Sequence, residues 1–231
     1  MMYAENLYKL GLTFLPEVGP VRARFLLEAV GNAEALFKEK KSALKKIPGI
    51  PALTLKEILK REVLQQAESE MRFSEKNGID LIFFDDPEYP VRLKACNDAP
   101  LVLYVKGNVK SNVSRVMAVV GSRKATPYGK NICEKLVKGL SLYNATVVSG
   151  LAYGIDICAH MEAVKNNIPT IAVVAHGLDM IYPQKHEKFV SEILDTGGLI
   201  SEFPSCTTLH PDFFPRRNRI IAGLSDATLV V

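Results

Sequence analysis

Short apolar runs alternate with amphipathic stretches along the second two-thirds of the chain. The runs are rich in Val, Leu and Ile, as expected of strands that are buried on both faces. The predicted strands are 116–120, 145–148, 170–174, 198–201 and 227–231. The predicted helices lie near 127–142, 155–166, 185–195 and 215–224.

This order of elements predicts an α/β domain with a parallel, Rossmann-like sheet covered by helices on both faces. Two earlier apolar runs, 79–84 and 101–105, predict further strands, with a polar break at 85–90 between them. The sequence stops inside the run 227–231, before any helix that would cover it. We therefore expect a piece of a longer protein, truncated at the C-terminal end of this domain.

Residues 1–75 have a helical pattern with two copies of a short turn. The first turn, Pro16-Glu17-Val18-Gly19-Pro20, lies between two amphipathic segments, and the second contains Pro48-Gly49. Paired turns of this kind resemble a tandem helix-hairpin-helix, a small SAM-like all-α module, so we expect domains at 1–75 and 76–231. Such a turn lets backbone N–H groups approach a phosphate. A plain helical packing module with tight turns is an equally weighted alternative.

The composition sets limits on this picture. Apolar residues make up 48% of the 231 residues, which supports an ordered core. The net charge is +4, and residues 1–75 carry 12 Lys and Arg against 10 Asp and Glu. Bulk charge therefore does not mark a nucleic-acid-binding protein, and any such site must come from a local cluster.

The cysteines and the N-terminus indicate in which part of the cell the protein is expected. Cys96, Cys133, Cys158 and Cys206 are far apart in the sequence and form no C-x-x-C pair, which is typical of free thiols in a reducing cytosol. The N-terminus lacks the pattern of a signal peptide, and no apolar run approaches the ~20 residues of a membrane span. We expect a soluble cytoplasmic protein without membrane contact.

Polar and glycine-rich segments follow the predicted strands. Gly121-Ser122-Arg123 follows the first, Ser149-Gly150 begins a segment that runs to Asp156 after the second, and Ala175–Asp179 follows the third. Ligands of open parallel sheets bind outside the carboxyl ends of the strands, where glycines allow positive φ and helix N-termini favour anions. Arg123 adds a guanidinium fork that matches phosphate. Glycines that only permit tight turns are the alternative for each segment taken alone, but together the segments favour an anion pocket.

A cluster of three arginines, Arg216, Arg217 and Arg219, begins the helix near 215–224. Basic charge is unfavourable at a helix N-terminus unless an anion compensates it. The alternative is a solvated basic helix start. The neighbouring Phe213 and Phe214 offer a stacking face to a base or belong to the core, and we expect at least one of them in the core.

The helical period predicts how these arginines are divided. Arg216 and Arg219 lie three residues apart and therefore share a face, so we expect them to form one functional pair. Arg217 lies ~100° around the helix axis from Arg216 and therefore faces another direction. The alternative is that one of the three arginines turns inward to a carboxylate such as Asp156 or Glu202 and braces the pocket.

The sequence lacks the motifs of several common nucleotide-binding and hydrolase sites. The chain has no G-x-G-x-x-G after the first strand, no G-x-x-x-x-G-K-[ST] and no G-x-S-x-G. Its four histidines, His160, His176, His186 and His210, are scattered. We expect no catalytic residue, no metal site and no cofactor.

Five segments occur in an order that is specific as a set. They are Val120–Arg123 with Tyr128-Gly129, Val148–Asp156 with Ala159-His160, Gly177–Asp179 with Tyr182-Pro183, Gly197–Glu202, and Phe214–Ser225. Through them residues 79–231 resemble the DprA/Smf family of bacterial DNA-processing proteins, and the helical region fits the family's N-terminal domain. The resemblance implies an extended Rossmann-like domain that binds and protects incoming single-stranded DNA and loads RecA onto it during natural transformation, without being an enzyme.

The resemblance also implies a binding pocket and partners. Carried over, the DNA-binding residues would be Gly121, Ser122, Arg123, Ser149, Gly150, Lys185, Phe214, Arg216, Arg217 and Arg219. Tyr153 stands where the family often has a basic residue, which reduces the expected charge of the pocket. The family forms homodimers largely through the region after the fifth strand of the α/β order. We expect dimers of the longer protein, which can also carry a winged-helix domain, rather than of this chain.

One enzyme family is the strongest alternative. The fold resembles that of the lysine-decarboxylase-like family, whose LOG members are phosphoribohydrolases that act on nucleotides. Of their P-G-G-x-G-T segment, only the glycine pair is matched in this sequence, by Gly197-Gly198. Glu202 lies on the wrong side of a strand to act as their catalytic glutamate. A scaffold with a vestigial pocket is the third possibility.

Overall fold

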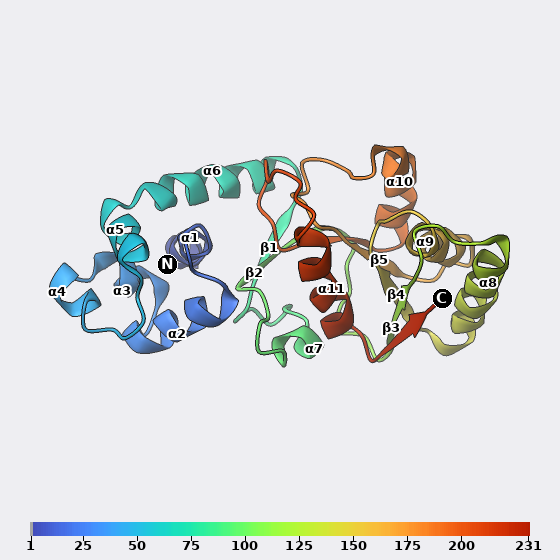
Figure 1. Cartoon of the computed structure of the whole chain (residues 1–231), viewed down its shortest axis with the longest axis horizontal. Helices are drawn as coiled ribbons and strands as arrows, with labels where there is room; N and C mark the ends of the chain where they lie inside the picture. The colour runs from blue at the N-terminus through green and yellow to red at the C-terminus, as the bar shows by residue number, and fades with distance from the viewer. Residues whose placement is uncertain (1) are drawn as a thin grey trace. The chain divides into compact units, whose positions relative to one another are not determined.

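The computed structural model describes residues 2–231, apart from the side chain of Met2. The chain forms two compact units. The first extends to Asp86 and includes Asn97–Val102, and the second contains Pro87–Cys96 and Leu103–Val231 (Figure 1).

The first unit is a helical module, as the turns predict. Its elements are α1 (Met2–Thr13), α2 (Pro20–Val30), α3 (Ala33–Lys38), α4 (Lys41–Leu44), α5 (Ala52–Lys60), α6 (Glu62–Lys76) and β1 (Asp80–Phe83). The local sequence explains where several helices begin and end. Pro20 begins α2, and Gly31 follows its last residue with φ +93°. The Asn32 side chain caps α3 by accepting the N–H of Ala35 at 2.7 Å. The Thr54 hydroxyl on α5 donates to the carbonyl of Pro16 at 2.8 Å, which ties the first turn to the second hairpin.

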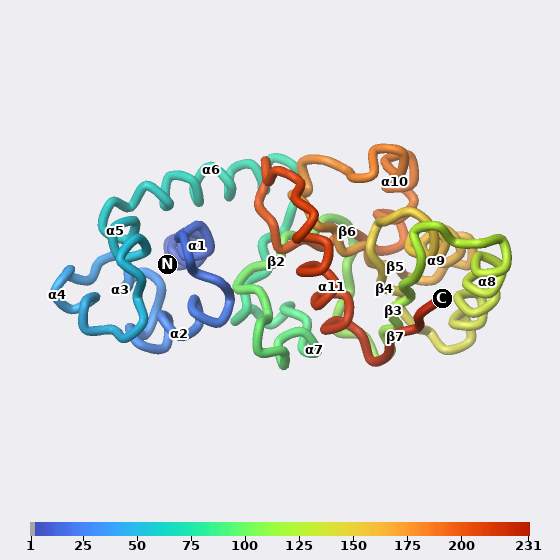
Figure 2. Tube along the Cα trace, in the orientation of Figure 1, coloured from blue at the N-terminus to red at the C-terminus, as the bar shows by residue number. Residues whose placement is uncertain are grey.

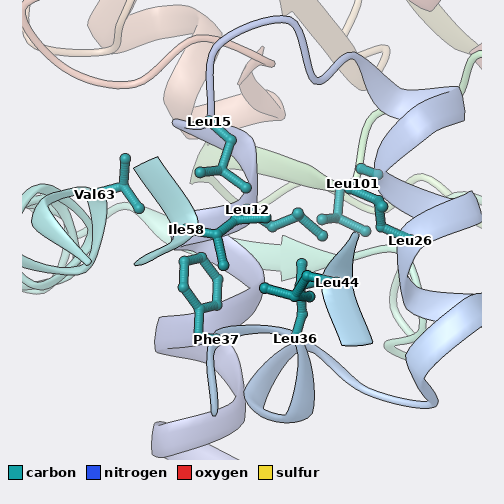
Figure 3. Packing of buried hydrophobic residues seen from close by; sticks show 10 residues of the cluster. Leu12, Leu15, Leu26, Leu36, Phe37, Leu44, Ile58, Val63 and Leu101 are labelled. Atoms are coloured by element: carbon teal, nitrogen blue, oxygen red, sulfur yellow. The ribbon is translucent and has the colours of Figure 1, made fainter. Parts of the chain in front are cut away.

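The core of this unit consists of leucines contributed by successive helices. Leu12, Leu26, Leu36 and Leu44 have no exposed surface, and Phe37 packs beside them (Figure 3). A short helix is marginal in water by itself, so this shared core stabilises α3 and α4.

The second unit contains the alternating elements. They are α7 (Val91–Lys94), β2 (Val102–Gly107), β3 (Val116–Val120), α8 (Pro127–Leu140), η1 (Ser141–Tyr143), β4 (Thr146–Ser149), α9 (Ile155–Lys165), β5 (Thr170–Val173), η2 (Gln184–His186), α10 (Glu187–Thr196), β6 (Gly198–Ser201), α11 (Phe213–Leu224) and β7 (Ala227–Val230).

Of the seven strands in residues 2–231, six lie wholly or mainly in the second unit, in the order β2-β6-β5-β4-β3-β7. The strands from β6 to β7 are parallel to one another, which confirms the Rossmann-like α/β architecture. The strand predicted at 101–105, for which no direction was predicted, lies outside this parallel set, because β2 pairs with β6 antiparallel, with Tyr104 opposite Ser201. An apolar run has the same pattern in either direction, so the sequence does not reveal an antiparallel partner.

The connections define where a ligand would bind. From β3 the sheet continues through β4 and β5 to β6 on one side. The chain then passes through α11 to β7, which lies on the other side of β3. α8, α9 and α10 lie on one face of the sheet and α11 on the other (Figure 2). β3 is therefore the topological switch point, and a crevice is expected outside its carboxyl end.

Candidate nucleic-acid interface

Two adjoining depressions lie at the carboxyl ends of β3, β4 and β5. One, of about 730 Å³, lies at the switch point and includes Gly121 after β3 and Thr228 on β7. The other, of about 380 Å³, is lined by the 151–153 loop, the 174–176 segment and Tyr182-Pro183. Arg123, Ala152, Phe214 and Arg217 line both depressions. The two depressions thus lie where the strand order predicts a ligand site.

Arg123 and Phe214 form the wall between the depressions. The guanidinium carbon of Arg123 lies 5.1 Å from the centroid of the Phe214 ring, within the range of a cation–π interaction. The ring of Tyr182, which is 44% exposed, lies 5.9 Å from Phe214. A fork of phosphate donors and two aromatic rings therefore line the same site.

Two hydroxyl groups of the loop before α8 accept hydrogen bonds from nearby backbone N–H groups. The Ser122 hydroxyl accepts the N–H of Lys124 at 3.1 Å, and Thr126 caps α8 by accepting the N–H of Gly129 at 3.0 Å. Pro127 then fills the first helical position. These contacts fix the backbone from which Arg123 projects.

The glycines have other roles than the sequence suggests. We expected positive φ at Gly121 and Gly150, but among the glycines of this site it is Gly154 that has it, at +83°. A Cβ on Gly154 would lie 2.0 Å from the carbonyl oxygen of Ser122, and a Cβ on Gly121 would lie 2.1 Å from that of Val231. Close packing of the chain on itself, rather than approach of a ligand, demands glycine at both positions.

Gly150 makes room for a buried pair of opposite charges. A Cβ there would lie 2.3 Å from a carboxylate oxygen of Asp156 and 2.6 Å from a guanidinium nitrogen of Arg217. Arg217 is 5% exposed and also donates to the carbonyl of Val173. Loss of hydration lowers the pKa of Arg217 to about 10, and the facing carboxylate of Asp156 opposes that shift. Burial raises the pKa of Asp156, and Arg217 counters this effect.

Arg216 and Arg219 share a face of α11, as their spacing predicts. Both guanidinium groups contact the same carboxylate oxygen of Glu202, at 3.1 Å and 2.5 Å. The Glu202 side chain is only 2% exposed, whereas those of Arg216 and Arg219 are 47% and 20% exposed. Glu202 thus supplies the anion that a basic helix start requires.

Two histidines that are distant in sequence brace the loop after β4. His160 on α9 is fully buried, with Nε2 2.6 Å from the carbonyl oxygen of Gly150 and Nδ1 2.7 Å from the Thr170 hydroxyl. A carbonyl only accepts, so Nε2 carries the proton. Burial lowers the pKa of His160 to about 4, which keeps the ring neutral. His186 approaches the next carbonyl, that of Leu151, at 2.8 Å.

A third histidine holds the segment that carries Tyr182. The Nε2 atom of His176 accepts the backbone N–H of Tyr182 at 3.2 Å, and Nδ1 lies 2.9 Å from the carbonyl of Gly177. Burial lowers the pKa of His176. Within residues 2–231 no three His, Cys, Asp or Glu side chains are grouped as metal ligands.

The predicted site residues fall into distinct groups. Gly121, Arg123, Phe214 and Arg217 line the depressions. Ser149 lies beneath them, with no exposed surface and its hydroxyl donated to the carbonyl of Val119. Lys185 instead lines a separate open surface with Gln184, Glu187 and Lys188.

Tyr182 also lines the smaller depression and Asn218 the larger one, and neither is among the predicted DNA-binding residues. His176, from the segment expected after the third strand, lines the smaller depression as well. Tyr182 comes soon after the carboxyl end of β5, and this position in the sequence is the signal that could have identified it.

The fold and the candidate site define an α/β protein whose depressions at the strand ends combine an arginine with aromatic rings. The chain belongs to the family described as DNA recombination-mediator protein A, whose model matches residues 80–231. Residues 10–61 match a SAM-like helix-hairpin-helix tandem. The family resemblance and the nature of the helical module are therefore confirmed.

Several relatives are similar to this chain. Protein Smf of Synechocystis sp. is 34% identical, over 100% of this chain and 59% of the relative. Protein Smf of Escherichia coli is 41% identical, over 71% and 44% respectively. DNA processing protein DprA of Bacillus subtilis is 37% identical, over 68% and 53%. The chain thus spans about half the length of these relatives.

Two solved structures are also similar. DNA processing protein A of Streptococcus pneumoniae matches with a TM-score of 0.78 and 32% identity, over 97% of this chain and 76% of that one. The Helicobacter pylori protein, described by its single-stranded DNA binding mode, matches with a TM-score of 0.59 and 30% identity, over 65% and 68%. In residues 2–231 no helix is both long and apolar enough to cross a membrane.

Proposed function

We propose that this chain binds single-stranded DNA at the two depressions outside β3, β4 and β5. The observation that carries the proposal is the position of Arg123 against Phe214, on the wall that both depressions share. The Helicobacter pylori relative, which is described as binding single-stranded DNA, supports the same ligand.

Each group at this wall has a role that fits its exposure. Arg123 is exposed and offers two parallel N–H donors to one phosphate. Phe214 and Tyr182 offer ring faces, and base–aromatic stacking contributes about 1–3 kcal/mol per base. A single strand can turn its bases toward such rings, whereas the bases of a duplex stay stacked on one another. The proposal therefore includes a preference for single strands.

The remaining predicted residues take supporting roles in this proposal. Arg217, with Asp156, holds α11 and the loop after β4 in register beneath the ligand, and Gly150 leaves the space for that pair. Gly121 and Ser122 shape the loop that carries Arg123. Arg216, Arg219 and Lys185 would contact only the flanking phosphates.

The binding test compares fluorescein-labelled oligonucleotides of one sequence by anisotropy, as single strand and as duplex, over a range of salt. We expect tighter binding of the single strand, with a log–log salt slope of roughly −0.7 per phosphate neutralised. Arg123→Ala and Phe214→Ala should each weaken binding by about 1–3 kcal/mol, which is roughly 5- to 150-fold. Arg123→Lys should restore only part of it, because an ammonium group lacks the guanidinium fork.

Arg115→Ala is the matched control for Arg123→Ala. Arg115 lies just before β3, at the opposite end of the strand, and its guanidinium donates to the carbonyl of Tyr143 at 2.8 Å. Equal affinity for single strand and duplex, or equal losses in Arg115→Ala and Arg123→Ala, would contradict this placement of the site.

We further propose that the full-length protein protects incoming DNA, loads RecA onto it and acts as a homodimer. These roles rest on membership of the family and on the relatives named as DNA processing proteins. They are tested by nuclease digestion of bound single strands and by the rate of RecA filament assembly with and without the protein. A protein that binds single strands but leaves the RecA rate unchanged would lack the loading role.

We also propose that the site is not catalytic. The carboxylate expected of a phosphoribohydrolase, that of Glu202, is engaged by Arg216 and Arg219 and does not line either depression. Incubation with AMP followed by chromatography should yield no free adenine above a blank. Release of adenine that Glu202→Gln abolishes would favour the enzyme instead.

A further inference from the structure

Two cysteines that are distant in sequence lie opposite each other where α8 packs on α9. The sulfur of Cys133 on α8 lies 4.0 Å from the carbonyl oxygen of Ile155 on α9. The sulfur of Cys158 on α9 lies 3.8 Å from the carbonyl oxygen of Lys130 on α8. Each sulfur thus reaches the backbone one turn before the other cysteine, and both belong to the same apolar cluster.

The two thiols are close neighbours and differ in exposure. Their proximity raises the pKa of Cys133 and lowers that of Cys158. Cys133 has no exposed surface, whereas Cys158 is partly exposed. A thiolate is the attacking species in thiol–disulfide exchange, and Cys158, the more exposed of the two, is the one that a disulfide from solution can reach.

We propose that Cys133 and Cys158 are a redox-active pair that forms a reversible disulfide between α8 and α9. The oxidant is a low-molecular-weight disulfide such as oxidised glutathione. The Cys158 thiolate attacks one sulfur of that disulfide, which releases one glutathione thiolate and leaves a mixed disulfide on Cys158. The Cys133 sulfur then attacks the Cys158 sulfur, the second glutathione leaves as a thiolate, and the Cys133 proton passes to it.

The position of this pair gives the bond a consequence. α8 follows the loop of Arg123, and α9 follows Gly154, whose neighbour Ile155 donates its N–H to the carbonyl of Ser122 at 3.2 Å. A disulfide within the first two turns of both helices would fix the two loops that border the site. It would close a loop of about 25 residues, and such closure should raise the melting temperature by roughly 5–10 °C. The pair stands apart from DNA binding, so failure of either proposal leaves the other intact.

The test incubates the native protein with oxidised glutathione, removes the glutathione and alkylates the remaining thiols in denaturant, where the buried Cys133 is also accessible. The peptides are then mapped by mass spectrometry. We expect most molecules to contain the Cys133–Cys158 peptide pair, with a loss of two hydrogen atoms that dithiothreitol reverses. Cys158→Ser should leave Cys133 alkylatable, since the first attacking group is gone. The exposed Cys206 serves as an internal control, because it should form only a mixed disulfide.

Two results would overturn the proposal. One is conversion of Cys206 to its mixed disulfide while Cys133 and Cys158 both remain alkylatable. The other is a Cys133–Cys158 bond that forms in protein unfolded with urea but not in native protein. The melting temperature of the oxidised wild type, compared with oxidised Cys158→Ser, supplies a second readout in the same samples.

Discussion

Substitution of Arg217 by Met removes one of two opposite charges buried beneath the site. The guanidinium, 5% exposed, faces the carboxylate of Asp156, 6% exposed, above Gly150. Met has similar length and no charge, so the change leaves Asp156 without its main counter-charge and the Val173 carbonyl without its donor. Breaking a buried pair in this way costs about 3–5 kcal/mol. For a chain of this size that corresponds to a decrease of roughly 6–20 °C in melting temperature.

The pH dependence of that loss has a definite sign. Burial raises the pKa of Asp156, and the positive charge of Arg217 is the strongest influence that lowers it again. Arg217→Met should therefore raise the pKa of Asp156 further. A carboxyl group whose folded pKa exceeds its unfolded pKa destabilises the fold as pH rises. The difference in melting temperature between wild type and Arg217→Met should be larger at pH 8 than at pH 5.

The control is a double-mutant cycle with Asp156→Asn. Because the two groups interact, the double variant should lose less stability than the sum of the single variants, by about 0.5–3 kcal/mol in chemical denaturation. Additive losses, or a melting temperature of Arg217→Met within one or two degrees of the wild type, would refute the assignment of Arg217 as a buried brace.

Three further predictions concern the same region. Gly150→Ala should lower the free energy of unfolding by about 1–3 kcal/mol in urea denaturation, because its methyl group overlaps the buried charges. His160 has a folded pKa of about 4 against an ordinary value of 6.5, so stability should fall by about 3 kcal/mol as pH decreases from 6.5 to 4. Urea titrations across that range should show the loss, and His160→Gln should flatten it. Arg219→Ala should lower the melting temperature more than Arg216→Ala, since the Arg219 side chain is the more buried of the two that contact Glu202.

The strands were predictable because each has a local signal. An apolar run followed by glycine or polar residues marks a buried strand and its carboxyl end, and the observed β3, β4, β5 and β6 lie within one residue of the predicted ranges. The direction of β2 was not predictable, because its partner β6 is distant in sequence. α11 begins at Phe213, two residues before the predicted 215, since helix ends vary by one or two residues.

The site was predictable only in its outline. Helical spacing correctly aligned Arg216 and Arg219, but it does not say which face of the helix meets the sheet. That choice depends on tertiary packing, and it turned Arg217 inward and both other arginines toward Glu202. The bracing role of His160 depends on tertiary packing too, since its partner Gly150 lies on the preceding loop and Thr170 on the next strand.

The different depths at which the charged groups of this site are buried explain how it presents a cation without destabilising the fold. Arg217 is buried, but Asp156 compensates its charge, so the layer beneath the two depressions is close to neutral. Arg123 lies in the exposed layer, where water solvates it until an anion arrives. The two residues should therefore separate cleanly in experiment: Arg123→Ala changes affinity and salt dependence at constant stability, whereas Arg217→Met changes stability first. A single basic cluster read from the sequence thus contains groups with different physical tasks, and burial decides which task each one has.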